Sequence, residues 1–319
     1  MWLESEYHLR INAWEGRLGN NIQQLCCAIF IAEKTDSCVT YCSHDIIANE
    51  TISFLKNTDK NKIPEHKVVS KTFFQYASCC GELLPLYNDS EQRRICETYI
   101  RPLFRTILET PNVLKLRSTD LIIHLRSGDV FNTHTHGLYV QNPFSYYKTV
   151  LDEIFQGLNK WDKTRRVIVL TEPDKRNPCM PLINSYIQQL NIRFAIKFVG
   201  QNVNTPFEYI ENIDLKTCIN TLLTAENIVL ANSSFSQRLS MCNTNLKNMY
   251  VSSLTIAEKA SDCPRITVHF HKIKNYTKHG EWRNTSMQYE NMKKHSIEDI
   301  EHLPIENAEL PKHFIKGQL

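Results

Sequence analysis

The sequence predicts an α/β protein with parallel sheets covered by helices, and two observations support this. In the second half of the chain, short apolar segments alternate with segments whose apolar residues recur at helical spacing. Near the N-terminus, a strand, a glycine-containing turn, a helix and a second strand follow one another, which is Rossmann-like connectivity. A chain of 319 residues has room for two domains of ordinary size, each with its own core.

The first predicted element is a strand over residues 7–13, where polar and apolar residues alternate. Gly16 and Gly19 then indicate a tight turn, and Asn20 or Asn21 is expected to cap the helix that follows. Such a turn presents backbone amides that suit an anion or a hydroxyl-bearing ligand, although the glycine spacing is not that of the dinucleotide-binding turn. The alternative is an ordinary helix start that packs on its sheet.

A second strand over residues 38–42 is expected to complete this unit. The chain over residues 45–110 is predicted to be mostly helical, with a weak strand near Val68 and an amphipathic helix over residues 90–110 that is interrupted near its proline. We place the first domain at residues 1–117, just before the next strand.

The segment 119–131 is central to the interpretation. The apolar run 121–123 predicts a buried parallel strand, and His124, Arg126 and Asp129 follow at its carboxyl end. Ligands of open α/β sheets bind outside the carboxyl ends of the strands, and an arginine there can hold a phosphate through two hydrogen bonds. The alternative is a strand that ends in a capped turn, with Arg126 paired to Asp129.

The second domain is expected to span residues 118–276 and to alternate helices with strands. Helices are predicted from Pro143 onward, over 181–190 and over 214–224, and strands over 166–171, 192–199, 227–230 and 249–252. The last of these is expected to be the final strand of the domain. Residues 277–319 are charged and polar, which predicts either a helix that returns to the first domain or a loosely held tail.

Two other predicted strands of this domain also end in polar residues. These are Thr171, Glu172 and Asp174 after one strand, and Asn232, Ser233, Ser234 and Ser236 after another. If the sheet is parallel, both clusters face the same edge as Arg126 and form one pocket with it. The serine-rich segment also begins a helix, so its hydroxyls and amides can cap that helix or bind a phosphate. With Arg126, it would neutralise a diphosphate leaving group without a metal ion.

Composition excludes some classes of protein. The net charge of +3, from 37 basic and 34 acidic residues, gives no field that would attract nucleic acid. No apolar run reaches the roughly 20 residues of a membrane span, and the first residues lack the pattern of a signal peptide. Eleven cysteines include the adjacent pairs Cys26–Cys27 and Cys79–Cys80 but no C-x-x-C motif, which favours reduced thiols in a core. We therefore expect a cytoplasmic protein, or one of the secretory lumen if a targeting segment has been removed.

Two H-x-H motifs occur, at His134 and His136 and at His269 and His271. Zinc needs three or four converging ligands, and two separated pairs do not specify them. We therefore expect no metal site. We interpret the first motif as a mobile rim of the predicted pocket that contacts an acceptor, the molecule that receives a group when the diphosphate leaves.

Three segments resemble, in order, the signatures of the fucosyltransferase superfamily: GRLGNNIQQL at 16–25, IIHLRSGD at 122–129 and ANSSFS at 231–236. The resemblance extends over roughly residues 7–252 and is to the α1,2-fucosyltransferases first, and to the protein O-fucosyltransferases more distantly. It implies a GT-B fold, in which two Rossmann-like domains face each other across a nucleotide-sugar cleft. It further implies inverting transfer of a sugar, usually fucose from GDP-fucose, to a hydroxyl of a glycan acceptor, without a metal or other cofactor.

The resemblance also implies roles for individual residues. Arg126 takes the place of the arginine that holds the donor diphosphate, His124 that of a histidine that shapes the site, and Asp129 that of the motif's acidic residue. Glu172 and Asp174 lie where relatives carry acidic residues that contact guanosine. The other donor-binding residues that it implies are Gly16, Gly19, Asn20, Asn232, Ser233, Ser234, Phe235 and Ser236.

Glu15 lies where some protein O-fucosyltransferases carry an acidic residue proposed as the catalytic base. A carboxylate within reach of the acceptor hydroxyl could take its proton, so Glu15, Arg126 and Asp129 are the candidate catalytic residues. The alternative is that Glu15 caps the adjacent helix or pairs with an arginine.

The chain departs from the family at two places. Ser127 stands where a second arginine is common, and Gln237 and Arg238 stand where tryptophans are common. Arg238 is a candidate replacement for the missing positive charge. Because of these departures, the donor can also be another GDP-sugar or another nucleotide sugar such as a UDP-sugar. A further alternative is that the chain is an inactive sugar-binding protein.

Overall fold

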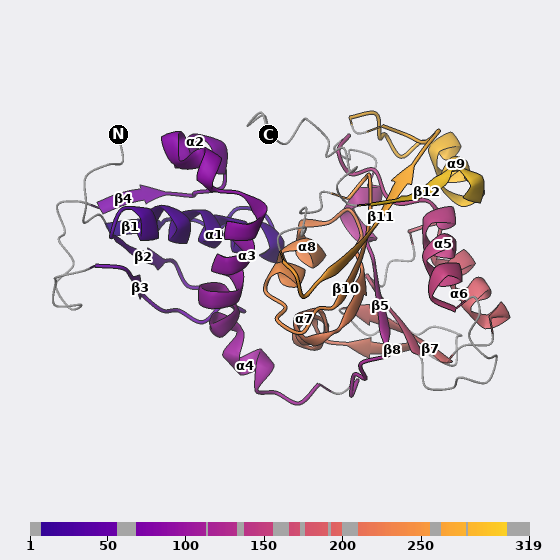
Figure 1. The fold of residues 1–319 in the computed structure, drawn as a ribbon, viewed down its shortest axis with the longest axis horizontal. Helices are drawn as coiled ribbons and strands as arrows, with labels where there is room; N and C mark the ends of the chain where they lie inside the picture. Colours follow the sequence, from indigo (N-terminus) through magenta and orange to yellow (C-terminus); the bar gives the residue numbers. More distant parts are fainter. Residues whose placement is uncertain are drawn as a thin grey trace. The chain divides into compact units, whose positions relative to one another are not determined.

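The structure, a computed structural model, describes most of the chain and divides it into two compact units (Figure 1). The described residues are 8–55, 68–112, 114–132, 137–155, 166–172, 176–190, 193–199, 210–255, 263–278 and 280–304. Of these, the first unit holds the residues up to Thr110 and the segment Arg238–Thr244, and the second unit holds the others. The predicted division was at residues 117 and 118. Both units are α/β with mainly parallel strands, compatible with Rossmann-like folds.

The first unit has a four-stranded sheet in the order β3-β2-β1-β4 among its described residues. The strands are β1 (His8–Ile11), β2 (Cys38–Tyr41), β3 (Ile52–Ser53) and β4 (Val68–Lys71). β1 pairs in parallel with both β2 and β4, whereas β3 is antiparallel to β2 and was not predicted. Because β2 and β4 lie on opposite sides of β1, the sheet reverses its direction of growth at β1.

Helix α1 (Leu18–Lys34) connects β1 to β2 and is buried along most of its length. The prediction that Asn20 or Asn21 caps this helix was wrong. The backbone amides of both asparagines donate to the carbonyl of Arg17, at 2.8 and 3.1 Å, so both lie inside the first turn. The helix begins earlier because Gly16 turns the chain at a φ of +70° and Arg17 is extended.

The predicted helix over 90–110 is interrupted, as expected. The other helical segments of this unit are α2 (Tyr76–Cys80), η2 (Gly81–Leu86), α3 (Asp89–Ile95), the π turn η3 (Cys96–Ile100), η4 (Arg101–Phe104) and α4 (Arg105–Leu108). Pro102 has no backbone N–H, so the hydrogen-bond ladder changes around it.

The second unit has an eight-stranded sheet among its described residues, in the order β12-β11-β10-β9-β5-β6-β7-β8. Its strands are β5 (Leu121–Leu125), β6 (Arg166–Thr171), β7 (Arg193–Val199), β8 (Ile210–Ile213), β9 (Asn227–Val229), β10 (Asn248–Ser252), β11 (Thr267–Ile273) and β12 (Ile300–Leu303). All neighbours are parallel except β11 and β12. The chain builds from β5 outward to β8, returns with β9 to the other side of β5, and builds outward again.

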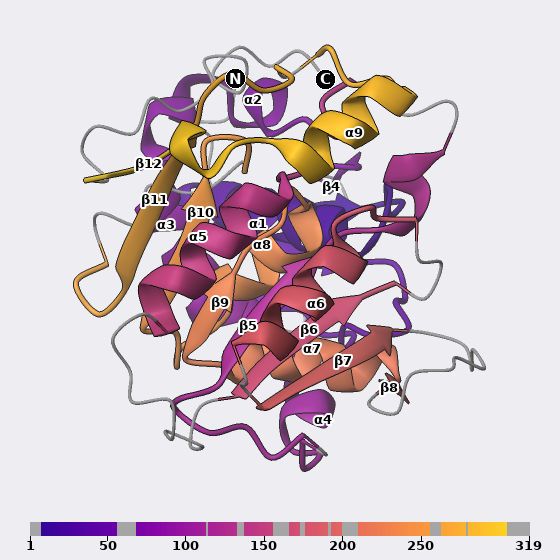
Figure 2. The same cartoon turned by 90° about the vertical axis from the view of Figure 1, so that its right-hand side faces the viewer.

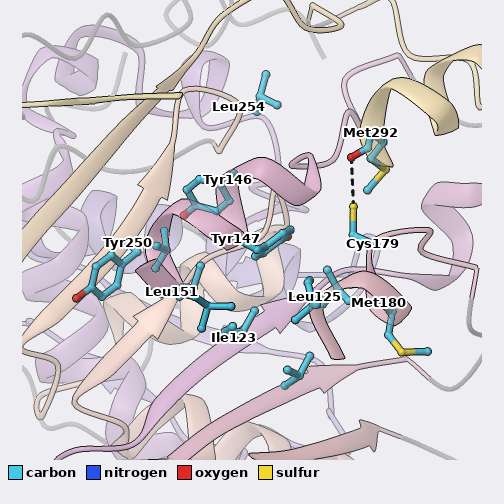
Figure 3. Close-up of a cluster of buried hydrophobic side chains, with 14 of the residues drawn as sticks. Ile123, Leu125, Tyr146, Tyr147, Leu151, Cys179, Met180, Tyr250, Leu254 and Met292 are labelled. Atoms are coloured by element: carbon cyan, nitrogen blue, oxygen red, sulfur yellow. Dashed lines mark hydrogen bonds between the residues drawn. The ribbon is translucent and has the colours of Figure 1, made fainter. Parts of the chain in front are cut away.

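Helices cover both faces of this sheet. They are α5 (Phe144–Phe155), α6 (Met180–Gln189), α7 (Leu215–Thr224), α8 (Ser234–Met241) and α9 (Ser286–Lys294), with the short turns η5 (Gly128–Phe131) and η7 (Ile297–Asp299). α5, α6 and α9 lie on one face (Figure 2). There Ile123 and Leu125 of β5 join a buried cluster with Tyr146 and Tyr147 (Figure 3). Because side chains alternate along a strand, His124 points to the opposite face.

The prediction that residues 249–252 form the last strand was wrong. β11 and β12 follow β10 in the same sheet, and β8 also was not predicted. Within the expected tail, the described residues 280–304 supply α9 and β12 to the second unit, and Met292 and Trp282 are fully buried in its core. Within the part of the chain that the structure describes, none of the helices combines the length and apolar character that crossing a bilayer requires.

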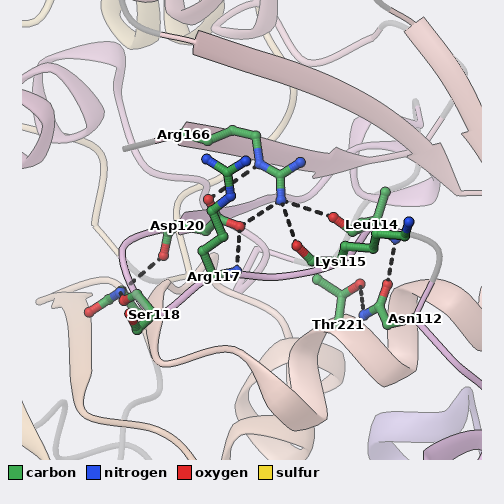
Figure 4. Close-up of polar contacts among 9 residues, drawn as sticks. Asn112, Leu114, Lys115, Arg117, Ser118, Asp120, Arg166 and Thr221 are labelled. Carbon is green, nitrogen blue, oxygen red and sulfur yellow. Dashed lines mark hydrogen bonds and ion pairs between the residues drawn. The ribbon is translucent and has the colours of Figure 1, made fainter. Parts of the chain in front are cut away.

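The segment that leads into β5 is held by a buried carboxylate (Figure 4). Asp120 is 2% exposed and pairs with Arg166 of β6 at 2.6 Å. Its carboxylate also accepts from the amide of Arg117 at 2.9 Å, and Arg166 donates to the carbonyl of Leu114 at 2.9 Å. These contacts fix the amino end of β5 and therefore the position of the residues at its carboxyl end.

Candidate functional site

The site lies at the carboxyl edge of the second sheet, where β5 and β9 are neighbours. The strand order reverses between these two strands, and open α/β sheets bind ligands in the crevice outside such a reversal. The predicted clusters after β5, β6 and β9 all face this edge, because the three strands are parallel. The structure therefore brings together most of the second-domain residues that the sequence singled out.

Arg126 is the cation of the site and is 14% exposed. Its Nη2 pairs with Asp129, as the alternative interpretation expected, and its Nη1 lies 3.8 Å from Glu172 Oε1. The backbone carbonyl of Arg126 accepts from Asn177 Nδ2 at 2.7 Å. Two carboxylates thus hold this guanidinium, and the Asn177 amide fixes the backbone beside it, so the side chain loses little entropy when an anion binds.

Gly128 makes this arrangement possible. Its φ is +73°, which residues with a Cβ rarely adopt, and a Cβ added there would lie 2.4 Å from Glu172 Oε2. The glycine therefore lets the turn after β5 pack directly against the carboxylate after β6. The neighbouring Ser127 is 1% exposed, and its hydroxyl accepts from the amide of Asn177 at 3.2 Å. Ser127 thus packs inside the turn.

His124 is buried, and its ring lies 5.7 Å from the ring of Phe235 on α8. Burial, together with the nearby charge of Arg126, lowers the pKa of His124 to about 3, so the imidazole is neutral at neutral pH. Its Nδ1 is buried and has no hydrogen-bond partner among the described residues. This nitrogen is therefore available to a ligand or to a water molecule at the sheet edge.

The serine-rich segment after β9 turns into helix α8. The carbonyl of Ser233 accepts from the amide of Gln237 at 3.3 Å, so the first amides of the helix point back toward the sheet edge. Ser234 is exposed and Phe235 half-buried. Ser236 is fully buried, and its hydroxyl has no partner among the described residues. The start of α8 therefore offers amides and a hydroxyl to an anion.

Asn232 has a structural role that the sequence did not reveal. Its Nδ2 donates to the carbonyls of Leu138 and Val140, both at 3.0 Å, and its own carbonyl accepts from Gln141 Nε2 at 3.3 Å. Both of its amide hydrogens are engaged in this way, so Asn232 holds the segment before α5 against the sheet edge.

The predicted roles of Asp174, of the first H-x-H motif and of Arg238 remain to be placed in the structure. Asp174, His134 and His136 lie outside the described residues. Arg238 is half-buried, and its Nη1 donates to Gln92 of α3 at 2.7 Å. Its guanidinium thus has a partner within the first unit.

The remaining predicted residues, Glu15, Gly16, Gly19 and Asn20, belong to the first unit. The amide of Glu15 donates to Gln24 Oε1 at 2.9 Å, and its carbonyl accepts from Asn21 Nδ2 at 3.1 Å. The carboxylate of Glu15 neither caps α1 nor forms an ion pair with an arginine among the described residues. Gly19 is buried in the first turn of the helix, and Gly16 makes the turn before it.

Known proteins provide no independent assignment for this site. No protein-family model, no curated protein and no solved structure matches this chain. The chemistry of the site is nevertheless defined by its groups. A held guanidinium, a neutral imidazole with an unused nitrogen and the start of a helix suit a ligand that carries phosphate oxygens.

Proposed function

We propose that the chain is an inverting glycosyltransferase of GT-B architecture that transfers fucose from GDP-fucose to a hydroxyl of a glycan acceptor. The observation that carries the proposal is the convergence of Arg126, His124 and the start of α8 at the reversal of the strand order. The sequence segments that resemble the fucosyltransferase signatures supply these same groups. The partners of the protein are then a nucleotide sugar and a glycan.

In this proposal the donor diphosphate binds Arg126. Its oxygens displace Asp129, which is 42% exposed and can turn to solvent, whereas Glu172 is 27% exposed and remains beside the guanidinium. The first amides of α8 add their partial positive charge. Both interactions strengthen as the bond to the sugar breaks and negative charge develops on GDP, so they stabilise the transition state more than the bound donor.

The transfer itself is a single displacement. The acceptor oxygen attacks the anomeric carbon, the bond from that carbon to the β-phosphate oxygen breaks, and GDP leaves with the electron pair. The acceptor proton passes to a carboxylate, for which we propose Glu15. This role requires the two units to face each other across a cleft, as in the GT-B architecture.

A thermal-shift panel tests the donor class. The full chain, treated with a chelator, is mixed with GDP, UDP, CDP or dTDP, each with and without manganese. We expect GDP alone to raise the melting temperature, because a ligand at 100 times its Kd stabilises the native state by about 2.7 kcal/mol. A shift seen only with UDP and manganese would contradict the fucose donor and favour another nucleotide sugar.

Arg126→Ala tests the site. The variant should lose the GDP-dependent shift, and the release of GDP from GDP-fucose in the presence of glycan acceptors should fall by about 10²–10³-fold, as for other groups that stabilise transition-state charge. Arg117→Ala is the matched control, because it removes the same charge from the amino end of β5. Wild-type protein that binds GDP-fucose but releases no GDP with any acceptor would favour an inactive sugar-binding protein.

A further inference from the structure

Glu153, His271 and His302 form a second polar cluster in the second unit. Glu153 lies in the last turn of α5, His271 on β11 and His302 on β12. One ligand atom from each, a carboxylate oxygen or an imidazole nitrogen, lies within 4.8 Å of the other two. The cluster is three strands from β5 in the sheet order, or about 14 Å at the usual strand spacing, so it is separate from Arg126.

The spacing within the cluster approaches that of a metal site. His271 Nε2 lies 3.1 and 3.0 Å from the two oxygens of Glu153, and His302 Nδ1 lies 3.3 Å from Oε1. Around a tetrahedral zinc ion with bonds of about 2.0–2.1 Å, ligand atoms are about 3.4 Å apart. The three groups therefore need only small side-chain rotations to surround an ion.

The backbone and the neighbouring rings hold these side chains in place. His271 and His302 are directly opposite in the antiparallel pairing of β11 with β12, and their rings stack with centroids 4.8 Å apart. The ring of Tyr146 packs with its edge against His271 at 5.6 Å. Since the ligands come from two paired strands and a helix, they are pre-organised for a single ion.

Burial differs along the cluster in a way that suits an open coordination position. The side chain of His271 is fully buried, that of Glu153 is 29% exposed and that of His302 is 47% exposed. An ion can therefore reach the cluster from the side of His302, and a water molecule can complete its coordination. His269 is close to His302, but its Nε2 faces Asn248 Oδ1 at 3.2 Å, so it already has a partner.

We propose that Glu153, His271 and His302 bind one divalent transition-metal ion of the zinc type, with water as the fourth ligand. Two imidazoles and one carboxylate suit zinc, cobalt or nickel and disfavour magnesium and calcium, which prefer oxygen ligands. The ion joins α5 to the outer strands β11 and β12 and has a structural role. It does not take part in the proposed sugar transfer, and the proposal does not depend on that transfer.

Metal titration of the full chain tests this. After chelator treatment, isothermal titration with zinc is expected to show one site per chain, and magnesium none. His302→Gln should weaken zinc binding at least tenfold. Lys274→Gln is the matched control, because Lys274, directly after β11, pairs with Glu301 on β12 at 2.7 Å and contributes no ligand. Zinc affinity should be unchanged in this control.

Cobalt distinguishes this site from the free cysteines. The proposed ligands predict visible cobalt bands without a sulfur-to-cobalt charge-transfer band, and both His302→Gln and Glu153→Gln should remove these visible bands. Circular dichroism of the two variants without metal checks that they fold. Wild-type protein that binds no zinc, a charge-transfer band from thiolate ligands, or unchanged zinc affinity in both folded variants would overturn the proposal.

Discussion

The carboxyl edges of the central strands differ between the two units, although both strands lie where the strand order reverses. In the first unit, the buried side chain of Gln24 satisfies the loops at this edge. Its Nε2 donates to the carbonyls of Ala13 and Thr72 at 3.0 and 2.6 Å, and its Oε1 accepts from the amide of Glu15. The edge of the first unit is therefore completed by its own side chains.

The histidines near the two edges show the same difference. His44 Nδ1 accepts from the amides of Ile46 and Ile47, and its Nε2 donates to Asn21 Oδ1 at 3.1 Å. His124 is more deeply buried, yet its Nδ1 has no partner among the described residues. An unsatisfied buried group costs about 1–3 kcal/mol. The second edge thus keeps an unpaired polar group, as the proposed donor site requires, whereas the side chains at the first edge support its own loops.

Gln24→Met should have the largest effect on stability. The substitution keeps the length and volume of the side chain but leaves the amide of Glu15 and two loop carbonyls without partners. We therefore expect the free energy of unfolding to fall by about 4 kcal/mol. Chemical denaturation measures this change. A loss below about 1 kcal/mol would contradict the idea that Gln24 organises the first edge.

Gly128→Ala should have the next largest effect. A positive φ and a carboxylate 2.4 Å from the added Cβ together should cost about 3 kcal/mol. Gly16→Ala is the matched comparison, since its φ is +70° but only Asn20 Nδ2 would lie within 3 Å of the added Cβ, whereas at Gly128 all three carboxylate atoms of Glu172 would. We expect the second variant to lose about 1–2 kcal/mol. Equal losses in the two variants would mean that the contact with Glu172 adds nothing.

Acid should destabilise the second unit through His124. Its folded pKa of about 3 lies below the ordinary value near 6.5, so between these values the unfolded chain binds more protons. The contribution of His124 to the free energy of unfolding is therefore fully present above about pH 6.5. Below that pH it falls by about 1.4 kcal/mol per pH unit, or about 2 kcal/mol by pH 5. His124→Gln should flatten this dependence in denaturation measured from pH 7 to 5. The control His44→Gln removes a half-buried, partnered imidazole and should change it less.

The sequence predicted the parts of the site whose signals are local. The apolar run of β5, the polar residues after it and the serines before α8 each follow one another in the chain, and one strand direction brings them to one edge. The start of α1 was missed because a backbone turn at Gly16 determines it, whereas a side-chain cap was expected.

Long-range partners could not be predicted in this way. Asn177, which holds the carbonyl of Arg126, and Glu153 and His302, which meet at His271, lie far apart in the chain. Nothing in their own sequence neighbourhood marks them, because their roles depend on which strands pair and which helix covers them. The pairing of β11 with β12 places His302 opposite His271. The sequence did not predict this pairing, because the residues after 277 are mostly polar and gave no strand signal.

Ser236→Ala should have the smallest effect on stability and is the sharpest test of the comparison. The buried hydroxyl has no partner among the described residues, so its removal should change the free energy of unfolding by less than about 0.5 kcal/mol or even raise it. If the second edge is built for a ligand, the same variant should bind GDP several-fold more weakly in a calorimetric titration. Unchanged affinity together with a stability loss above about 1 kcal/mol would assign Ser236 to packing alone, and the start of α8 would then contribute only its backbone amides.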